Sequence, residues 1–109
     1  MKHYLLLICL TATLTPGHVM RVIDGDTFVL YNVIGVTTEE HVRLNGIDTP
    51  ERGQDKAADA TAFTRVWLEG GNFRLISCQR DKYGRLLSTV TRGTSSLAKD
   101  LIAAGYQKP

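Results

Sequence analysis

Five short stretches of the chain are rich in β-branched and large apolar residues, a composition typical of strands. The pattern predicts strands at residues 19–23, 27–31, 41–47, 73–78 and 86–91. In the third stretch Val42 and Leu44 share one face, and Arg43 lies on the opposite one. Residues 24–26 supply turn chemistry between the first two strands.

Two other stretches have helical spacing. Residues 55–68 place Phe63 and Trp67 on one apolar stripe, and Gly70 follows as a stop signal. A shorter helix is expected from an N-cap at Ser95 or Ser96 through residue 104. Five short strands with a helix between the third and the fourth predict a five-stranded β-barrel with helices, of the OB type.

Length and composition set the class of protein. The chain has 109 residues, of which 43% are hydrophobic and 22% charged, as expected for one folded domain. No apolar run approaches the roughly 20 residues that span a bilayer, so we expect no stable membrane anchor. The net charge is only +2, which excludes a histone-like coat for nucleic acid. We expect a monomer.

The first residues resemble a secretory signal. A short basic start is followed by the apolar run 4–10, and Gly17 closes the best candidate cleavage site. The expected division is a signal peptide at 1–17 and a domain at 18–109, which would place the mature protein in the periplasm or outside the cell. The alternatives are a buried first strand or the leader of a cytoplasmic protein. After cleavage Cys78 would be the single cysteine, an unpaired small apolar residue in a strand.

Charge is distributed unevenly along the chain. Residues 18–51 carry six acids against two arginines, and residues 73–92 carry five basic residues against one acid. Acidic loops favour a cation, and a basic segment beside them favours an anion. The alternative is two solvated faces of opposite sign.

The spacing of the acids favours a metal site. Asp24 and Asp26 lie on a tight turn at a strand end, and Asp48 and Glu51 follow another strand. Hard oxygen donors from two strand ends can close on one Ca²⁺ with the help of a backbone carbonyl and waters. No histidine or cysteine accompanies them, which disfavours zinc. Each acidic loop by itself would ordinarily be only a turn.

Three blocks occur in a characteristic order, at residues 22–27 (VIDGDT), 42–51 (VRLNGIDTPE) and 81–87 (DKYGRLL). They resemble the signature blocks of the staphylococcal nuclease (thermonuclease) family. Residues 58–68 and 96–105 resemble that family's first two helices. The resemblance implies an OB-fold domain that hydrolyses DNA and RNA to 3′-phosphate products, with Ca²⁺ as cofactor and single-stranded or loosened nucleic acid as the preferred substrate.

The resemblance also implies roles for the acidic residues. Asp26 and Asp48 would ligate calcium, and Thr49 would lend its backbone carbonyl. Asp24 would lie just behind these ligands. Glu51 would contact the metal through water and act as general base, which is a role that a carboxylate beside a metal can perform.

Basic and aromatic residues receive the substrate roles. Arg43 and Arg85 would grip the scissile phosphate, and Lys82 and Tyr83 would line the nucleotide pocket. Phosphodiester attack builds negative charge on oxygen, and the planar fork of arginine binds two oxygens at once. The alternative for either arginine alone is a surface ion pair.

The end of the sequence departs from the family. Family members continue past residues 107–109 with a third helix, so we expect a fold that lacks this C-terminal helix and is marginally stable. A catalytically silent OB-fold module that binds nucleic acid or a protein partner is the main alternative to an enzyme. A purely structural calcium-binding module is another, but it leaves Arg43 and Arg85 unexplained.

Overall fold

The computed structural model describes residues 13–31 and 39–109. The strands are β1 (Val19–Asp24), β2 (Thr27–Tyr31), β3 (Glu39–Leu44), β4 (Arg74–Arg80), β5 (Leu86–Arg92) and β6 (Ser95–Ser96). The helices are η2 (Pro16–His18, a 3₁₀ turn), α2 (Ala57–Glu69) and α3 (Leu97–Ala103). The five predicted strands and two predicted helices are confirmed, and the two-residue β6 is an addition. Within the described part of the chain, no helix has both the length and the apolar character to cross a membrane.

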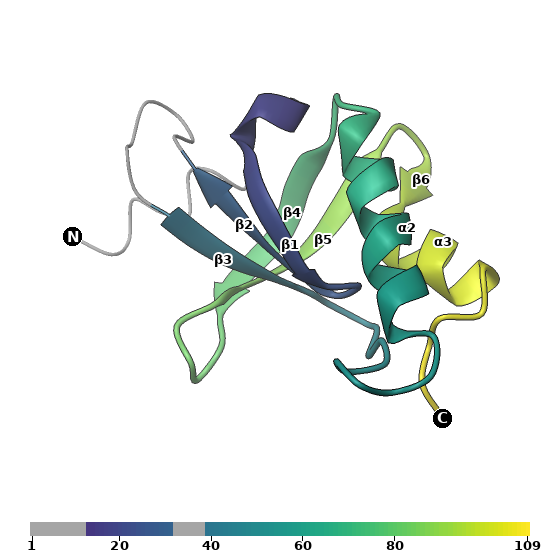
Figure 1. Ribbon diagram of the computed structural model, residues 1–109. Coiled ribbons are helices and arrows are strands. Elements are labelled where there is room, and N and C mark those ends of the chain that lie inside the picture. Colours follow the sequence, from purple (N-terminus) through teal and green to yellow (C-terminus); the bar gives the residue numbers. More distant parts are fainter. Residues whose placement is uncertain (1–12, 32–38) are drawn as a thin grey trace.

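The strands form one mixed sheet in the order β1-β2-β3-β5-β4, with β6 beside β5. All neighbouring pairs are antiparallel except β3 and β5, which run parallel. No ladder joins β4 back to β1 within the described residues, so the sheet is not closed. Helices α2 and α3 lie next to each other at one side of the twisted sheet (Figure 1). This arrangement confirms the OB-type α+β class.

Several element boundaries differ from the sequence-based prediction, and three of the differences have a visible backbone cause. Strand β3 ends at Leu44 instead of residue 47, because the chain turns through Gly46 at a φ of +82°. Helix α2 begins at Ala57 instead of residue 55, after Lys56 in the left-handed region. Strand β4 continues past residue 78 to Arg80 across a bulge that places Ser77 at a φ of +54°.

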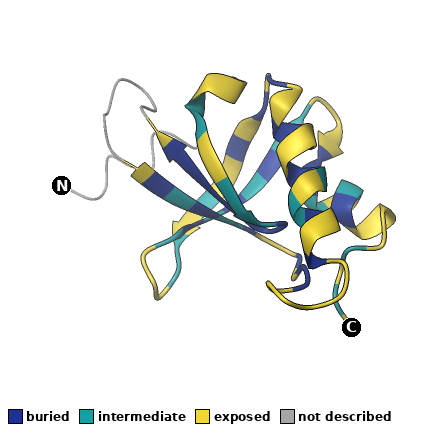
Figure 2. Ribbon diagram, in the orientation of Figure 1, coloured by how far each residue is buried: buried dark blue, intermediate teal, exposed yellow. Residues whose placement is uncertain are grey.

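The core fills the space between the sheet and the two helices (Figure 2). In β3 Val42 and Leu44 are buried while Arg43 lies on the opposite, partly exposed face, as the alternation predicts. Trp67 of α2 is confirmed as a core residue, and its indole N–H donates to Asp100 of α3 at 2.8 Å. The largest fully buried side chains come from nearly every element and include Phe28, Leu30, Leu44, Leu68, Phe73, Leu75, Leu86, Leu97 and Leu101.

Leu14 belongs to this core although it precedes the expected signal cleavage site. Its side chain is 1% exposed, and its backbone exchanges two hydrogen bonds with Phe73, at 2.7 and 3.2 Å. Residues 1–12 of the expected signal peptide lie outside the described residues. The boundary at residue 17 stays a prediction, and cleavage there would remove one core side chain.

Cys78 of β4 faces Ser88 of β5, with 2.9 Å between the sulfur and the hydroxyl oxygen. We expected an unpaired Cys78 in a chain cleaved after Gly17, but in the full chain Cys78 is disulfide-bonded. Disulfide pairing requires Cα atoms within about 4.4–6.8 Å, a distance that only the folded chain sets. Sequence spacing therefore could not reveal it.

Candidate active site

One polar cleft of about 200 Å³ gathers most of the predicted site residues. Its lining consists of Asp24, Asp26, Thr27, Arg43, Asp48, Thr49, Glu51 and Arg85. The sheet brings them together, because Thr27 of β2 pairs with Arg43 of β3 and β3 runs parallel to β5, which follows Arg85. Residues as far apart in sequence as 24 and 85 therefore share one cleft.

A second cavity, of about 500 Å³, adjoins this cleft. It shares Arg43, Asp48 and Arg85 with the cleft and adds Lys82 and Tyr83. All nine predicted site residues thus line two adjoining hollows, the smaller one acidic with two arginines and the larger one reaching along the β4–β5 loop.

Asp26 is the buried anchor of the cleft, with 6% of its surface exposed. One carboxylate oxygen accepts from the Thr27 hydroxyl at 3.0 Å, and the other accepts from the Thr49 backbone N–H at 3.0 Å. A buried carboxylate requires such partners to offset its desolvation. Asp26 therefore ties the end of β2 to the loop that carries Asp48, Thr49 and Glu51.

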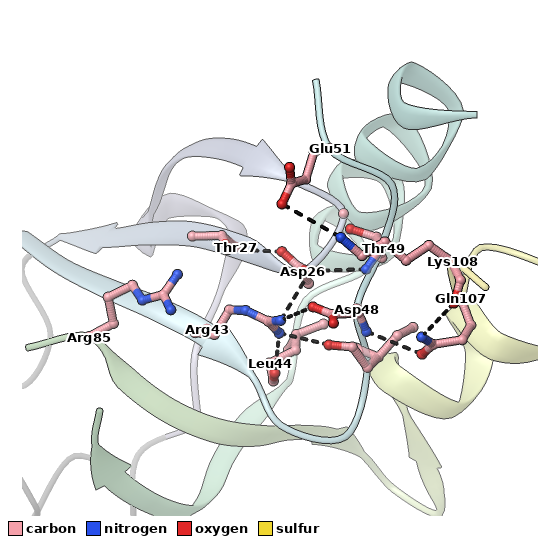
Figure 3. A network of polar contacts seen from close by, with 12 residues as sticks. Asp26, Thr27, Arg43, Leu44, Asp48, Thr49, Glu51, Arg85, Gln107 and Lys108 are labelled. Atoms are coloured by element: carbon pink, nitrogen blue, oxygen red, sulfur yellow. Dashed lines mark hydrogen bonds and ion pairs between the residues drawn. The ribbon is translucent and has the colours of Figure 1, made fainter. Parts of the chain in front are cut away.

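The Arg43 guanidinium lies between two of the predicted metal ligands (Figure 3). It is 2.5 Å from an Asp48 oxygen and 3.4 Å from an Asp26 oxygen. It also donates to the carbonyls of Leu44 and Ile47, at 2.6 and 2.8 Å. The ion-pair alternative for Arg43 is therefore observed, but inside the cleft, where it neutralises two carboxylates that would otherwise repel each other.

Asp24 lies at the rim of the same cleft. Partial burial, together with the negative charges of Asp26 and Glu51, raises the pKa of the Asp24 carboxyl. Arg52 and Arg43 oppose this rise without cancelling it. Crowded carboxylates of this kind favour a proton or a cation among them.

The donor set of the cleft fits a hard divalent cation in chemistry. Carboxylate oxygens of Asp26 and Asp48 line it, and the buried Thr49 hydroxyl has no hydrogen-bond partner among the described residues. In the same part of the chain, however, no three acidic, histidine or cysteine side chains are gathered closely enough to hold a metal ion. Arg43 supplies the positive charge between Asp26 and Asp48, and its contact with the Asp48 oxygen would have to break before a cation could bind that oxygen.

Asp81 organises the other side of the cleft, where the β4–β5 loop turns. Its carboxylate accepts from the backbone N–H groups of Tyr83 and Arg85, at 2.9 and 2.8 Å, and from Arg85 Nε at 2.7 Å. Desolvation alone would raise the pKa of Asp81, but these hydrogen bonds outweigh it and hold the pKa below its ordinary value. The ion-pair alternative is thus also observed for Arg85.

Tyr83 projects from this loop with 71% of its surface exposed, so it is not a core residue. Lys82 Nζ and the Arg85 guanidinium lie 5.2 and 5.4 Å from its ring centroid. These are cation–π distances, and they leave an aromatic surface flanked by positive charge at the mouth of the larger cavity.

Four residues around the site were missed by the sequence analysis. Arg80 makes two hydrogen bonds to Glu40, at 2.5 and 2.9 Å, and a third to the Gly84 carbonyl at 3.0 Å, which supports the β4–β5 loop. Gln107 and Lys108 contact the loop that holds Asp48 and Glu51. Apart from the local Arg80–Gly84 bond, these contacts join residues 40 to 59 positions apart in sequence, so no spacing rule could connect them.

Comparisons with known proteins agree with this geometry. A family model described as staphylococcal nuclease homologue matches residues 41–108. The chain is 37% identical to a thermonuclease of Staphylococcus intermedius and 32% identical to one of Staphylococcus hyicus, over 78% and 83% of this chain and 56% of each relative. It is 36% identical to an uncharacterized endonuclease of Escherichia coli over 68% of this chain and 46% of that protein.

This chain spans about half the length of the curated relatives that it matches. The family-model match nevertheless includes most of β3 with Arg43, the loop with Asp48 and Glu51, the β4–β5 loop with Arg85, and both α-helices. Five of the eight cleft residues lie within the match, and Asp24, Asp26 and Thr27 precede it. The chain therefore belongs to the staphylococcal nuclease family.

Proposed function

We propose that this chain forms the catalytic domain of a calcium-dependent endonuclease that hydrolyses DNA and RNA and leaves 3′-phosphate ends. The observation that carries the proposal is the single cleft in which Asp26, Asp48 and Glu51 face Arg43 and Arg85. Such a cleft can offset charge on a phosphodiester and activate water in one place.

The charged groups of the cleft have complementary tasks. A calcium ion, when bound, would be held by Asp26, Asp48 and the Thr49 carbonyl and would polarise the phosphoryl oxygen. Glu51, whose side chain is 72% exposed, is accessible to an attacking water and can take a proton from it. Arg43 and Arg85 would donate to the non-bridging oxygens as negative charge develops there.

The larger cavity supports a nucleotide subsite. Tyr83 offers an exposed ring for a base or a sugar, and Lys82 beside it offers a positive charge. Stacking on an exposed ring requires an unpaired base, which favours single-stranded or loosened nucleic acid.

A catalytically silent module that binds nucleic acid is the second candidate. The observation in its favour is that Arg43 already occupies the carboxylates that a metal would need. Both candidates predict binding to denatured DNA, and only the enzyme predicts turnover.

The decisive experiment incubates the purified chain with denatured DNA and with RNA, in calcium, in magnesium and in excess chelator. We expect cleavage with calcium, weak cleavage with magnesium because the irregular site suits the larger ion, and none with chelator. The Glu51→Gln variant, which keeps shape and loses the base, is the matched control for a contaminating nuclease. Cleavage that survives the chelator would refute the calcium proposal, and binding without cleavage would establish the silent module.

The product ends are read on the same digests. Fragments with 3′-phosphates prime a polymerase only after phosphatase treatment. Fragments that prime without phosphatase would contradict the proposed chemistry while leaving nuclease activity intact.

We further propose that the protein is exported, on the strength of the basic and apolar pattern of residues 1–17, and that it is a monomer. Fractionation of expressing cells and N-terminal sequencing of the product test this, and size-exclusion chromatography tests the monomer. A mature protein that begins at His18 would lack Leu14 of the core, so we expect it to melt at a lower temperature than a chain that keeps this residue.

A further inference from the structure

The C-terminal segment after α3 folds back onto the loop that carries Asp48 and Glu51. Tyr106 starts it by donating its backbone N–H to Leu101 of α3 at 3.0 Å and by packing edge-on against Phe63 of α2, with 5.7 Å between ring centroids. The next two residues, Gln107 and Lys108, are thereby held beside the cleft, and Figure 3 shows them reaching this loop from the side opposite Arg85.

The segment occupies both backbone hydrogen-bonding groups of Asp48. The Asp48 N–H donates to the Gln107 side-chain oxygen at 3.1 Å, and the Asp48 carbonyl accepts from the Lys108 N–H at 2.8 Å. The Asp48 side chain is left to face Arg43 and the cleft. A double backbone contact of this kind fixes the position of a residue as a strand pairing would.

Lys108 makes a third contact, with Glu51. Its ammonium lies 3.6 Å from a Glu51 carboxylate oxygen. At the far end of the same loop, Gln54 accepts from the Glu51 N–H at 2.7 Å and donates its own N–H to the Glu51 carbonyl at 2.8 Å. The stretch 45–54 contains no helix or strand, so it depends on contacts of this kind. The Asp26–Thr49 bond, the Arg43 contacts with Ile47 and Asp48, and the Asn45 N–H bond to the Ser88 carbonyl hold its first half.

We propose that Gln107 and Lys108 are positioning residues for the reaction, which clamp the Asp48–Glu51 loop in the geometry that cation binding and water activation require. The proposal rests on the proposed function. Partners one contact away from a metal ligand typically change metal affinity or activity by about 10–100-fold when they are removed. Because the Glu51 side chain is 72% exposed, solvent screens its pair with the partly exposed Lys108, so the pair should contribute little to folding and its effect should fall on turnover.

The test compares the parent with Gln107→Leu, which removes the acceptor, and Lys108→Met, which removes the charge and keeps the stem. Gln79→Leu and Lys99→Met are matched controls, since their side chains are exposed and make no hydrogen bond or ion pair within the described part of the chain. Lys108→Arg serves as the conservative rescue. The readouts are kcat and KM on denatured DNA, calcium affinity by titration calorimetry, and amide hydrogen exchange of residues 45–54 without cation.

We expect Gln107→Leu to lower calcium affinity and kcat by roughly 10-fold, with KM within twofold, and to speed exchange of the loop amides. Lys108→Met should lower kcat several-fold, and Lys108→Arg should restore it. If the parent is fully active and both variants keep its kcat and calcium affinity, the clamp is refuted and the proposed function is not. A loop whose amides exchange equally fast in parent and variants would overturn it as well. A parent that cleaves nothing, although its loop is protected, would instead refute the proposed function and with it the catalytic role of the clamp.

Discussion

The two arginines of the cleft are held by different kinds of structure. Arg43 extends from the end of β3, has 17% of its side chain exposed, and contacts two carboxylates and two backbone carbonyls. Arg85 extends from the β4–β5 loop, has 33% of its side chain exposed, and is held by Asp81 four residues earlier. Arg43 joins the loop that follows its own strand to the distant Asp26, whereas Arg85 is held within its own turn.

This difference implies that Arg43 contributes to folding as well as to the reaction, whereas Arg85 contributes mainly to the reaction. Each aspartate would keep two hydrogen-bond donors if its arginine were removed, but Asp26 is buried and would lose its cation there, whereas Asp81 is partly exposed to solvent. The two arginines should therefore matter about equally in turnover and unequally in folding.

The largest expected effect is on catalysis. Arg43→Ala and Arg85→Ala should each lower kcat by about 10²-fold or more, because each donor acts on charge that develops in the transition state. Arg74→Ala, at an exposed position on β4, is the matched control. Steady-state kinetics on denatured DNA decide the matter, and a folded variant that cleaves at the parent rate would remove that arginine from the mechanism.

A slightly smaller effect is expected from ligand binding on the free energy of unfolding. Calcium and a nucleoside 3′-phosphate bind only the native state, and at 100 times the dissociation constant they should add about 2.7 kcal/mol to the free energy of unfolding. Thermal melts with and without both ligands measure this. The Arg43→Ala and Arg85→Ala variants should each gain less than the parent, and a parent that gains nothing would contradict the site.

The proposed difference between Arg43 and Arg85 is tested by the folding stability of their alanine variants. Arg43→Ala should cost about 1–3 kcal/mol, the penalty for leaving a buried carboxylate with an unmet partner. Arg85→Ala should cost at most about 1 kcal/mol, since its ion pair is partly exposed and solvent screens it. Denaturant titration of both variants gives the numbers, and equal costs would show that the two sides of the cleft are held alike.

The smallest effect concerns Asp81. The folded-state pKa of this carboxyl is lowered, so its stabilising contribution is present above the unfolded-state value of about 3.9 and is lost as the pH falls through the folded value. The melting temperature of Asp81→Asn should thus lie below that of the parent at pH 7, and the two should converge at more acidic pH. A difference that stays constant down to pH 2 would mean that hydrogen bonding by Asp81 does not depend on its charge.

The sequence by itself determined the secondary-structure elements and singled out residues that the fold then gathers around one cleft. Strict alternation around Val42, Arg43 and Leu44 is a local property of an extended chain, and β3 turns Arg43 away from the core as that alternation requires. Ser96 is confirmed as the N-cap of α3, with its hydroxyl accepting from the Lys99 N–H, because capping needs only residues three apart. The family blocks were readable for the same reason, since each is a short continuous stretch.

Only the tertiary structure decided how these pieces act on one another. The position of Arg43 between Asp26 and Asp48, the grip of Arg80 on Glu40, and the hold of Gln107 on Asp48 join residues from 5 to 59 positions apart. The same holds for Leu14, which reads as part of a leader and lies in the core opposite Phe73. Such contacts depend on the order and register of the strands, and distances set by sheet pairing leave no mark in local periodicity.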